Sequence, residues 1–364
     1  MIRVLMDEKI TRTAVSVDED FQYFAENKEL DVKQGTEITL GPSKDKIEIT
    51  FKGERIRAAY LSVKGKNQEW VSYRGKKYRG EIRYYIDQKS LYVINLLDLE
   101  DYTRGVVPVE IGLKDPKYFQ ALKCAAVAGR TYAIMKLEQR QKNFDVYADV
   151  RDQAYVGFSG ETVIDNAAVT ETFNEILTYK GQPAKMFYHS TCGGYTENFE
   201  NAFGNVTFPY LIAVEDRFCE ESPFFEWEEE YNTGEIYKSL VNAGLLKIGL
   251  SAVTDIEISE RHKTGRVSKM TVKLSDGKSV VIDGRRVRDV FKSKKNGEIL
   301  RSSLFEIETE KNRGVLQGVI FMGRGYGHGV GMCQWGALVQ SQNDTDYRDI
   351  LKFYFPGTEV SKLK

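Results

Sequence analysis

The first part of the chain alternates hydrophobic and polar side chains with the two-residue period of β-strands. Gly-Pro, Lys-Gly and similar turn pairs separate these short runs, which cover residues 2–5, 37–40, 47–51, 58–63, 81–86 and 91–94. A meander of this kind predicts a β-rich scaffold over residues 1–90.

The pattern becomes helical after this scaffold. Asp115 and Pro116 supply an N-cap and a first-turn proline. Residues 118–141 then consist largely of Ala, Leu, Lys, Met and Gln, which favour helices. Lys123 and Arg130 are seven residues apart, nearly two full turns, so both project from one face of the predicted helix. That face is either a solvated basic stripe or a pair of cations that line an anionic cleft.

The remaining elements and two shifts in charge predict an α+β fold with an inserted domain. Strands are predicted at residues 175–179, 269–274 and 280–282, helices at 166–172, 287–291, 335–342 and 347–354, and an apolar strand before Gly193 and Gly194. Residues 214–230 hold eight acidic side chains and one basic, and residues 261–301 hold 13 basic and four acidic. We therefore predict a β-rich lead-in over 1–90, a core with a central helix lining a cleft over 91–231 and 319–364, and a smaller basic α+β domain over 232–318.

Composition argues against several classes of protein. The 364 residues include 52 Lys and Arg against 53 Asp and Glu, and the net charge of −1 disfavours a nucleic-acid partner. The longest largely apolar run, at about residues 91–97, is far shorter than the roughly 20 residues that cross a bilayer. We therefore expect no membrane span, and the first residues look like a strand rather than a signal peptide.

Two segments carry candidate chemistry. An apolar stretch ends at Glu110, whose neighbours in the sequence are Val109 and Ile111. Desolvation there would raise the pKa of Glu110 and suit a general acid. Many glutamates in such positions are, however, only capping residues. Six glycines between residues 323 and 336 surround His328 and Gln334. This run lacks the Lys-Ser/Thr and the βαβ context of a phosphate-binding loop. It predicts instead a close approach of the backbone, with His328 either functional or buried and structural.

A third segment offers metal ligands. His189 and Cys192 are close in sequence, Cys219 adds a thiolate, and zinc prefers such ligands. The shell would be completed by Asp216, His328, Cys333 or water. The alternatives are an inert cysteine at the end of a strand and a disulfide between Cys192 and Cys219 in an oxidising compartment.

Six motifs occur in an order that resembles stage II sporulation protein D and its amidase-enhancer relatives. They are LEDYxxxVVPVE ending at Glu110, ALKCAAVAGRTY ending at Tyr132, DQAYVG ending at Gly157, HSTCGG from His189, PYL ending at Leu211, and GHGVGMCQWGA from Gly327. Some family members bind zinc through a pair of cysteines in the segment before the Gln-x-Tyr of the DQAYVG motif. Tyr147 and Asp152 hold those two positions here, so that particular site is expected to be absent, and Cys333 replaces the family's usual serine.

The resemblance implies a lytic transglycosylase that cleaves peptidoglycan glycan strands, preferably peptide-free ones, to anhydro-muramyl ends in the extracytoplasmic cell envelope, with no required cofactor. Glu110 falls at the family's catalytic position, where it would act first as an acid and then as a base. The matching positions of the substrate-binding cleft are Lys123, Arg130, Gln153, Tyr155, His189, Ser190, His328 and Gln334. The competing interpretation is a non-catalytic peptidoglycan-binding activator of a cell-wall amidase.

Overall fold

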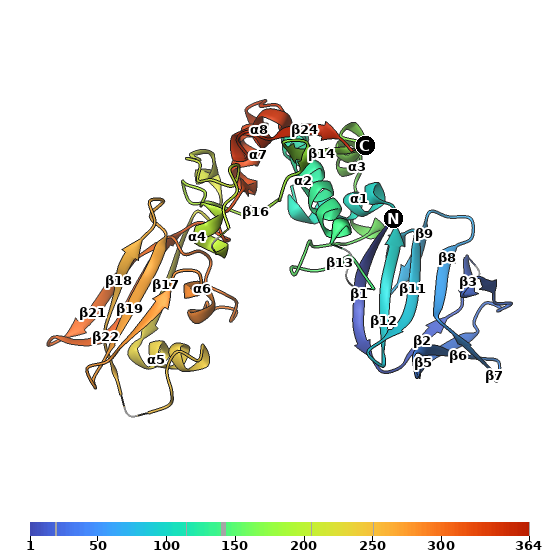
Figure 1. Cartoon of the computed structure of the whole chain (residues 1–364), viewed down its shortest axis with the longest axis horizontal. Coiled ribbons are helices and arrows are strands. Elements are labelled where there is room, and N and C mark those ends of the chain that lie inside the picture. Colours follow the sequence, from blue (N-terminus) through green and yellow to red (C-terminus); the bar gives the residue numbers. More distant parts are fainter. Residues whose placement is uncertain (19, 114, 140–142, 205, 250, 364) are drawn as a thin grey trace. The chain divides into compact units, whose positions relative to one another are not determined.

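The computed structural model (Figure 1) describes residues 1–18, 20–113, 115–139, 143–204, 206–249 and 251–363. The chain forms two compact units, which are unit 1 (Met1–Lys185 with Val360–Lys364) and unit 2 (Met186–Glu359). Each unit contains helices and sheets, which confirms the predicted α+β class. Unit 1 ends inside the predicted core, and the predicted range 232–318 lies within unit 2. The three-part division made from the sequence therefore stays a prediction.

Unit 1 is built on one large sheet and several smaller ones. Its strands are β1 (Ile2–Ile10), β2 (Thr13–Ser16), β3 (Phe21–Ala25), β4 (Lys28–Glu29), β5 (Glu37–Ser43), β6 (Lys46–Phe51), β7 (Glu54–Ala58), β8 (Tyr60–Gly65), β9 (Trp70–Tyr73), β10 (Lys76–Arg79), β11 (Glu81–Asp87), β12 (Ser90–Leu97), β13 (Val146–Tyr147), β14 (Glu175–Tyr179), β15 (Gln182–Pro183) and β24 (Glu359–Lys362). The large sheet has the order β13-β1-β12-β11-β8-β3-β4, and β1, β12 and β11 lie side by side in Figure 1.

A four-stranded sheet, β2-β5-β6-β7, shares a hydrophobic core with the large sheet. Ile47, Ile49 and Phe51 of β6 are buried and alternate with more exposed neighbours, as the two-residue pattern predicts. The run predicted as one strand over residues 58–63 forms parts of two strands, because a bend at Ala59 separates β7 from β8.

The helices of unit 1 are α1 (Leu99–Glu110), α2 (Phe119–Glu138) and α3 (Val163–Glu171), with the 3₁₀ turns η1 (Pro116–Tyr118) and η2 (Phe158–Gly160). The predicted helix over 118–141 is confirmed as η1 followed by α2. Its start is capped by the Asp115 carboxylate, which accepts a hydrogen bond from the Lys117 amide at 3.1 Å. Its predicted end, Gln141, lies outside the described residues.

Helix α1 is an element that the sequence pattern does not predict. Gly105 and Pro108 both lie inside it, and both residue types disfavour an isolated helix. Asp98 caps the first turn, and the side chains of Tyr102 and Val106 are fully buried. Most helical stability in proteins comes from packing of this kind, so tertiary contacts override the weak local preference.

A buried ion pair joins α1, α2 and β14. Arg130 of α2 is fully buried, and its Nε and Nη2 each donate to a carboxylate oxygen of Glu100 in α1 at 2.8 Å. Its Nη1 donates to the backbone oxygen of Glu175 in β14, also at 2.8 Å. A bidentate pair of this type fixes direction as well as distance. Arg130 therefore sets how α1 lies on α2.

Unit 2 contains two three-stranded sheets, ordered β17-β22-β21 and β18-β19-β20, and a short parallel pair, β16-β23. Its strands are β16 (Tyr188–His189), β17 (Glu226–Asn232), β18 (Val253–Arg261), β19 (Val267–Leu274), β20 (Ser279–Asp283), β21 (Phe305–Asn312), β22 (Val315–Arg324) and β23 (Met332–Cys333). Its helices are α4 (Phe199–Phe203), η3 (Phe218–Glu221), α5 (Thr233–Asn242), α6 (Val287–Val290), α7 (Gln334–Gln342) and α8 (Tyr347–Tyr354).

In unit 2, the strands predicted at residues 269–274 and 280–282 are confirmed as β19 and β20. The helices predicted at residues 287–291, 335–342 and 347–354 are confirmed as α6, α7 and α8. The apolar strand expected before Gly193 is reduced to the two residues of β16, because its partner β23 is equally short. Aromatic rings fill the core of this unit, where Phe305 and Phe321 stack with their centroids 4.7 Å apart. Within the described part of the chain, every helix is too short or too polar to span a membrane.

We predict that Arg130→Met destabilises the chain by roughly 3–5 kcal/mol, because it leaves the largely enclosed Glu100 carboxylate without its partner. The double variant with Glu100→Leu should recover most of this loss, since no unpaired charge then remains. The control Lys117→Met removes one member of an exposed pair and should change the free energy of unfolding by less than about 1 kcal/mol. Urea unfolding measures all three, and equal losses in the single and double variants would contradict the argument.

Candidate functional site

The residues predicted from the sequence fall into two groups, one in each unit. Unit 1 holds Glu110, Lys123, Arg130, Gln153 and Tyr155, and unit 2 holds His189, Ser190, His328 and Gln334. Each group is gathered around a few elements, which are α1 and α2 in unit 1 and β16 and β23 in unit 2.

Glu110 is the last residue of α1 and is half-buried. The sequence predicted a cover from Val109 and Ile111, but Val109 is 40% exposed and only Ile111 is buried. Successive helix residues point about 100° apart, so sequence neighbours do not shield the same side chain. The charge of Glu110 acts on two phenols of the described residues, those of Tyr102 and Tyr132.

Both phenols stay neutral beside Glu110. Burial is the main cause that raises the pKa of Tyr132, followed by its hydrogen bond to Asp152 and by the charges of Asp152 and Glu110. The Tyr132 hydroxyl donates to the Asp152 carboxylate at 2.5 Å, and Lys136 Nζ lies 2.6 Å from the same oxygen. Complete burial likewise raises the pKa of Tyr102 well above its usual value. Tyr132 lies in a motif read from the sequence, but nothing in the pattern singled it out.

Gln153 and Tyr155 are interior residues that position α1. The Tyr155 ring stacks on Tyr102 with centroids 5.4 Å apart, and its hydroxyl donates to Asn95 Oδ1 at 2.7 Å. Gln153 is 1% exposed and accepts a hydrogen bond from the Tyr102 hydroxyl at 3.1 Å. A Cβ at Gly105 would collide with the Tyr155 ring, so this glycine in α1 is required by close approach. These contacts favour a supporting role, and direct substrate binding by the pair stays a prediction.

Lys123 and Arg130 share one face of α2, as their spacing predicts, and both meet acidic partners there. Lys123 Nζ lies 2.6 Å from Glu171 Oε2 of α3, and Arg130 is paired with Glu100. The Arg130 guanidinium is enclosed and fully occupied by the contacts described above, which argues against direct contact with a ligand. This face is therefore neither a solvated stripe nor a simple pair of open cations.

In unit 2, the parallel pair β16-β23 places His189 opposite Cys333. Ser190 directly follows His189 in the chain, and Gln334 directly follows Cys333. His189 Nδ1 lies 3.1 Å from the Val330 backbone oxygen, so Nδ1 carries the proton and donates. Its Nε2 then holds a lone pair, which meets no hydrogen-bond donor among the described residues. The His328 ring lies 5.5 Å from that of His189, and its Nδ1 accepts a hydrogen bond from the Val330 amide at 3.0 Å.

The glycine-rich run lies close against other parts of unit 2, as predicted. A Cβ at Gly327 would lie 2.6 Å from the His189 Cβ, and one at Gly329 would lie 2.5 Å from the Arg266 guanidinium. Both glycines have positive φ, 120° and 83°, which side chains rarely adopt. The glycines therefore let the backbone cover the face of Arg266 while presenting His328.

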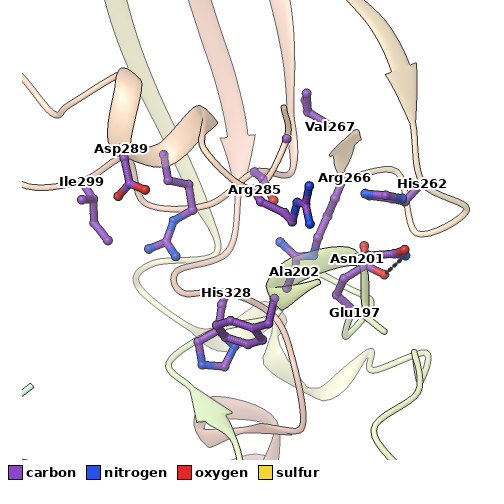
Figure 2. A pocket seen from close by; sticks show the side chains of 14 residues that line it. Glu197, Asn201, Ala202, His262, Arg266, Val267, Arg285, Asp289, Ile299 and His328 are labelled. Atoms are coloured by element: carbon purple, nitrogen blue, oxygen red, sulfur yellow. Dashed lines mark hydrogen bonds between the residues drawn. The ribbon is translucent and has the colours of Figure 1, made fainter. Parts of the chain in front are cut away.

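A cavity of about 300 Å³ lies next to His328 (Figure 2). Arg266 lines it and is only 2% exposed, with Nη2 donating to the Cys192 backbone oxygen at 2.7 Å. Its Nε and Nη1 reach no hydrogen-bond acceptor among the described residues. Arg285 and Arg288 add positive charge, while Glu197 and Asp289 add negative charge. Such a cavity can accept a small anionic group. The sequence indicated only a basic run here and did not distinguish Arg266 within it.

Two of the three predicted metal ligands come together in unit 2. The side chains of Cys192 and Cys219 meet those of Asp216 and Cys333, and all four are buried. His189 is not part of this cluster, because its ring is held at Val330 and beside His328. Asp216 and Cys333 were among the candidates for completing the shell.

Comparisons with known proteins match both units. A family model described as "Stage II sporulation protein" matches residues 87–179, and a model of a domain of unknown function matches residues 195–331. An uncharacterised protein of Brachyspira hyodysenteriae is 32% identical over 80% of this chain and 74% of its own length. Stage II sporulation protein D of Bacillus subtilis is 28% identical over 73% of this chain and 75% of its own. The B. subtilis amidase enhancer is 27% identical over 71% of this chain and 40% of its own.

The chain belongs to the family of stage II sporulation protein D and the amidase enhancers, which confirms the resemblance read from its motifs. The sporulation-protein model covers α1 and α2 and therefore Glu110, Lys123 and Arg130. The family model of the domain of unknown function covers Arg266 and His328.

We predict that protonation of His328 opposes folding. Burial first, and then the charges of Arg288 and Arg266, lower its pKa to about 3, against about 6.5 in an unfolded chain. The stability contributed by the neutral ring is therefore complete above pH 6.5 and is lost as the pH falls towards 3. Below pH 6, the free energy of unfolding of the wild type should fall relative to that of His328→Asn by up to about 1.4 kcal/mol per pH unit. Urea unfolding at pH 7.5, 6 and 5 measures it, and a constant difference would contradict it.

Proposed function

We propose that the chain is a peptidoglycan lytic transglycosylase of the cell envelope and that Glu110 is its catalytic residue. Membership of the family supports a role in the cell wall. The observation that carries the proposed chemistry is the location of Glu110, half-buried at the end of α1 beside two neutral phenols.

The end of a helix suits a group that must donate a proton. The C-terminal end of a helix dipole carries about half a negative charge, and charges of the opposite sign are favoured there by roughly 0.3–1 kcal/mol. A carboxylate at that end therefore gains no stabilisation from the helix dipole. A carboxyl group at this location can hold a proton and take one back, as acid–base catalysis requires.

One carboxyl group suffices for this reaction because the substrate supplies its own nucleophile. Glu110 protonates the glycosidic oxygen while that C–O bond breaks, and the primary hydroxyl of the same muramyl residue attacks the anomeric carbon. Glu110 then takes the proton of that hydroxyl. One C–O bond breaks, one forms, and the proton is returned, so neither water nor the second carboxylate of most glycosidases is needed.

Lys123 is the cation of unit 1 that we propose for binding the lactyl carboxylates of peptide-free glycan. Its partner, Glu171, has a side chain that is 54% exposed, so a substrate carboxylate can compete for the ammonium group. Ser190, His328 and Gln334 are half-buried and remain proposed contacts of the glycan in unit 2. No cofactor is required by this scheme.

We predict that Glu110→Gln abolishes glycan cleavage while the chain stays folded. The acid and base roles each contribute roughly 10²–10⁴-fold, and the amide can perform neither. Glu138→Gln is a matched control, because Glu138 is also the last residue of a helix, but an exposed one. Mass spectrometry of the ends formed from purified peptide-free glycan measures the effect. Retention of more than about a tenth of wild-type activity in Glu110→Gln would exclude the assigned role.

Activation of a cell-wall amidase is the second candidate function, and the likeness to an amidase enhancer favours it. A purified amidase acting on intact peptidoglycan distinguishes the two functions when wild type or Glu110→Gln is added. An activator should stimulate amide cleavage equally in both forms without producing anhydro-muramyl ends. A transglycosylase should produce those ends in the wild type alone.

A further inference from the structure

Three thiols and a carboxylate converge inside unit 2. The Sγ atoms of Cys192, Cys219 and Cys333 and a carboxylate oxygen of Asp216 all lie within 4.8 Å of one another, and all four residues are 0% exposed. The Cys192 and Cys219 sulfurs are 3.2 Å apart, and Cys192 Sγ is 3.3 Å from Asp216 Oδ2. We propose that these four residues bind one zinc ion, which holds the fold of unit 2 together.

The ligands come from three separate parts of unit 2. Cys192 follows β16, Asp216 and Cys219 flank the start of η3, and Cys333 ends β23 at the N-terminus of α7. Four protein ligands fill a tetrahedral shell and leave no position for water, which is the arrangement of structural rather than catalytic zinc sites.

Hydrogen-bond donors surround the ligand atoms and orient them. The Tyr354 hydroxyl donates to Asp216 Oδ2 at 2.8 Å, and the Phe218 amide donates to Asp216 Oδ1 at 3.0 Å. The Cys192 amide donates to Cys333 Sγ at 3.3 Å. Donors aimed at ligand atoms in this way support the ionised forms that bind metals, and they are the usual outer shell of a metal site.

A glycine keeps the approach to the cluster open. A Cβ at Gly336, in the first turn of α7, would collide with the Tyr354 hydroxyl and with the Asp216 carboxylate. The Gly336 amide also donates to Cys333 Sγ at 3.4 Å. Helix α7 can therefore start directly over the four ligands only because this position has no side chain.

The chemistry of the ligands selects zinc over the other common ions. Thiolates are soft ligands and suit zinc, whereas magnesium and calcium prefer oxygen atoms alone. A Cys192–Cys219 disulfide is the main alternative. It would need the two sulfurs at about 2.05 Å, and it would leave Cys333 and Asp216 buried together without a cation. The metal interpretation uses all four residues.

The test measures zinc in the full chain purified without chelator, with activity not used as a readout. We expect about one equivalent per chain in the wild type and a loss of zinc in Cys219→Ser and Asp216→Ala. Asp216→Cys should retain zinc, because a fourth thiolate can replace the carboxylate. Cys124→Ser is the matched control, since Cys124 is a buried cysteine of α2 in unit 1, and it should retain zinc as well.

Thiol titration in denaturant with chelator separates the alternatives. The proposal expects all four cysteines of the chain to react. Less than about a tenth of an equivalent of zinc in the wild type would overturn it, as would only two reactive thiols, which would indicate a disulfide. Chelation should also lower the melting temperature of the wild type, and added zinc should restore it. These outcomes do not depend on whether Glu110 is catalytic.

Discussion

The bidentate ion pair between Arg130 and Glu100 is the interaction on which the arrangement of unit 1 depends. It holds α1 against α2 and ties both to β14, so it sets how α1 lies within the unit. Because Glu110 is the last residue of α1, the location of the proposed acid follows from an interaction ten residues away. Buried polar side chains thus form hydrogen bonds around α1, the helix that carries the carboxyl group, and they include those of Arg130, Gln153 and Tyr155.

The sequence was sufficient for the parts of the fold whose local pattern agrees with their surroundings. The segment formed by η1 and α2 has both a capping residue, Asp115, and strong helix formers, and strand β6 has a clean alternation. Helix α1 has a capping residue, Asp98, but Gly105 and Pro108 oppose it locally, and burial of its side chains makes it stable. Spacing placed Lys123 and Arg130 on one face but gave no information on what that face contacts, so the burial of Arg130 could not be foreseen.

The candidate groups in unit 2 show the same limit of sequence reasoning. The short distance between His189 and Cys192 in the sequence suggested a shared metal, yet the His189 ring turns to Val330 and Cys192 lies beyond the end of β16. Cys333 lies 141 residues beyond Cys192 and reaches it only because β16 and β23 are parallel neighbours. The guanidinium of Arg266, two of whose donors meet no acceptor among the described residues, likewise lies against Gly329, which no local pattern reports.

Strand β24 belongs to unit 1 but is synthesised late, and this order affects how unit 1 can fold. This strand completes the three-stranded sheet β15-β14-β24 of unit 1, yet the ribosome makes it only after the whole of unit 2. During translation the neighbouring edge of β14 therefore has its backbone groups uncovered, and such an edge is a template for pairing with other chains. A nascent chain of this protein thus needs β24 before unit 1 is closed, and loss of β24 would damage the unit that was made first.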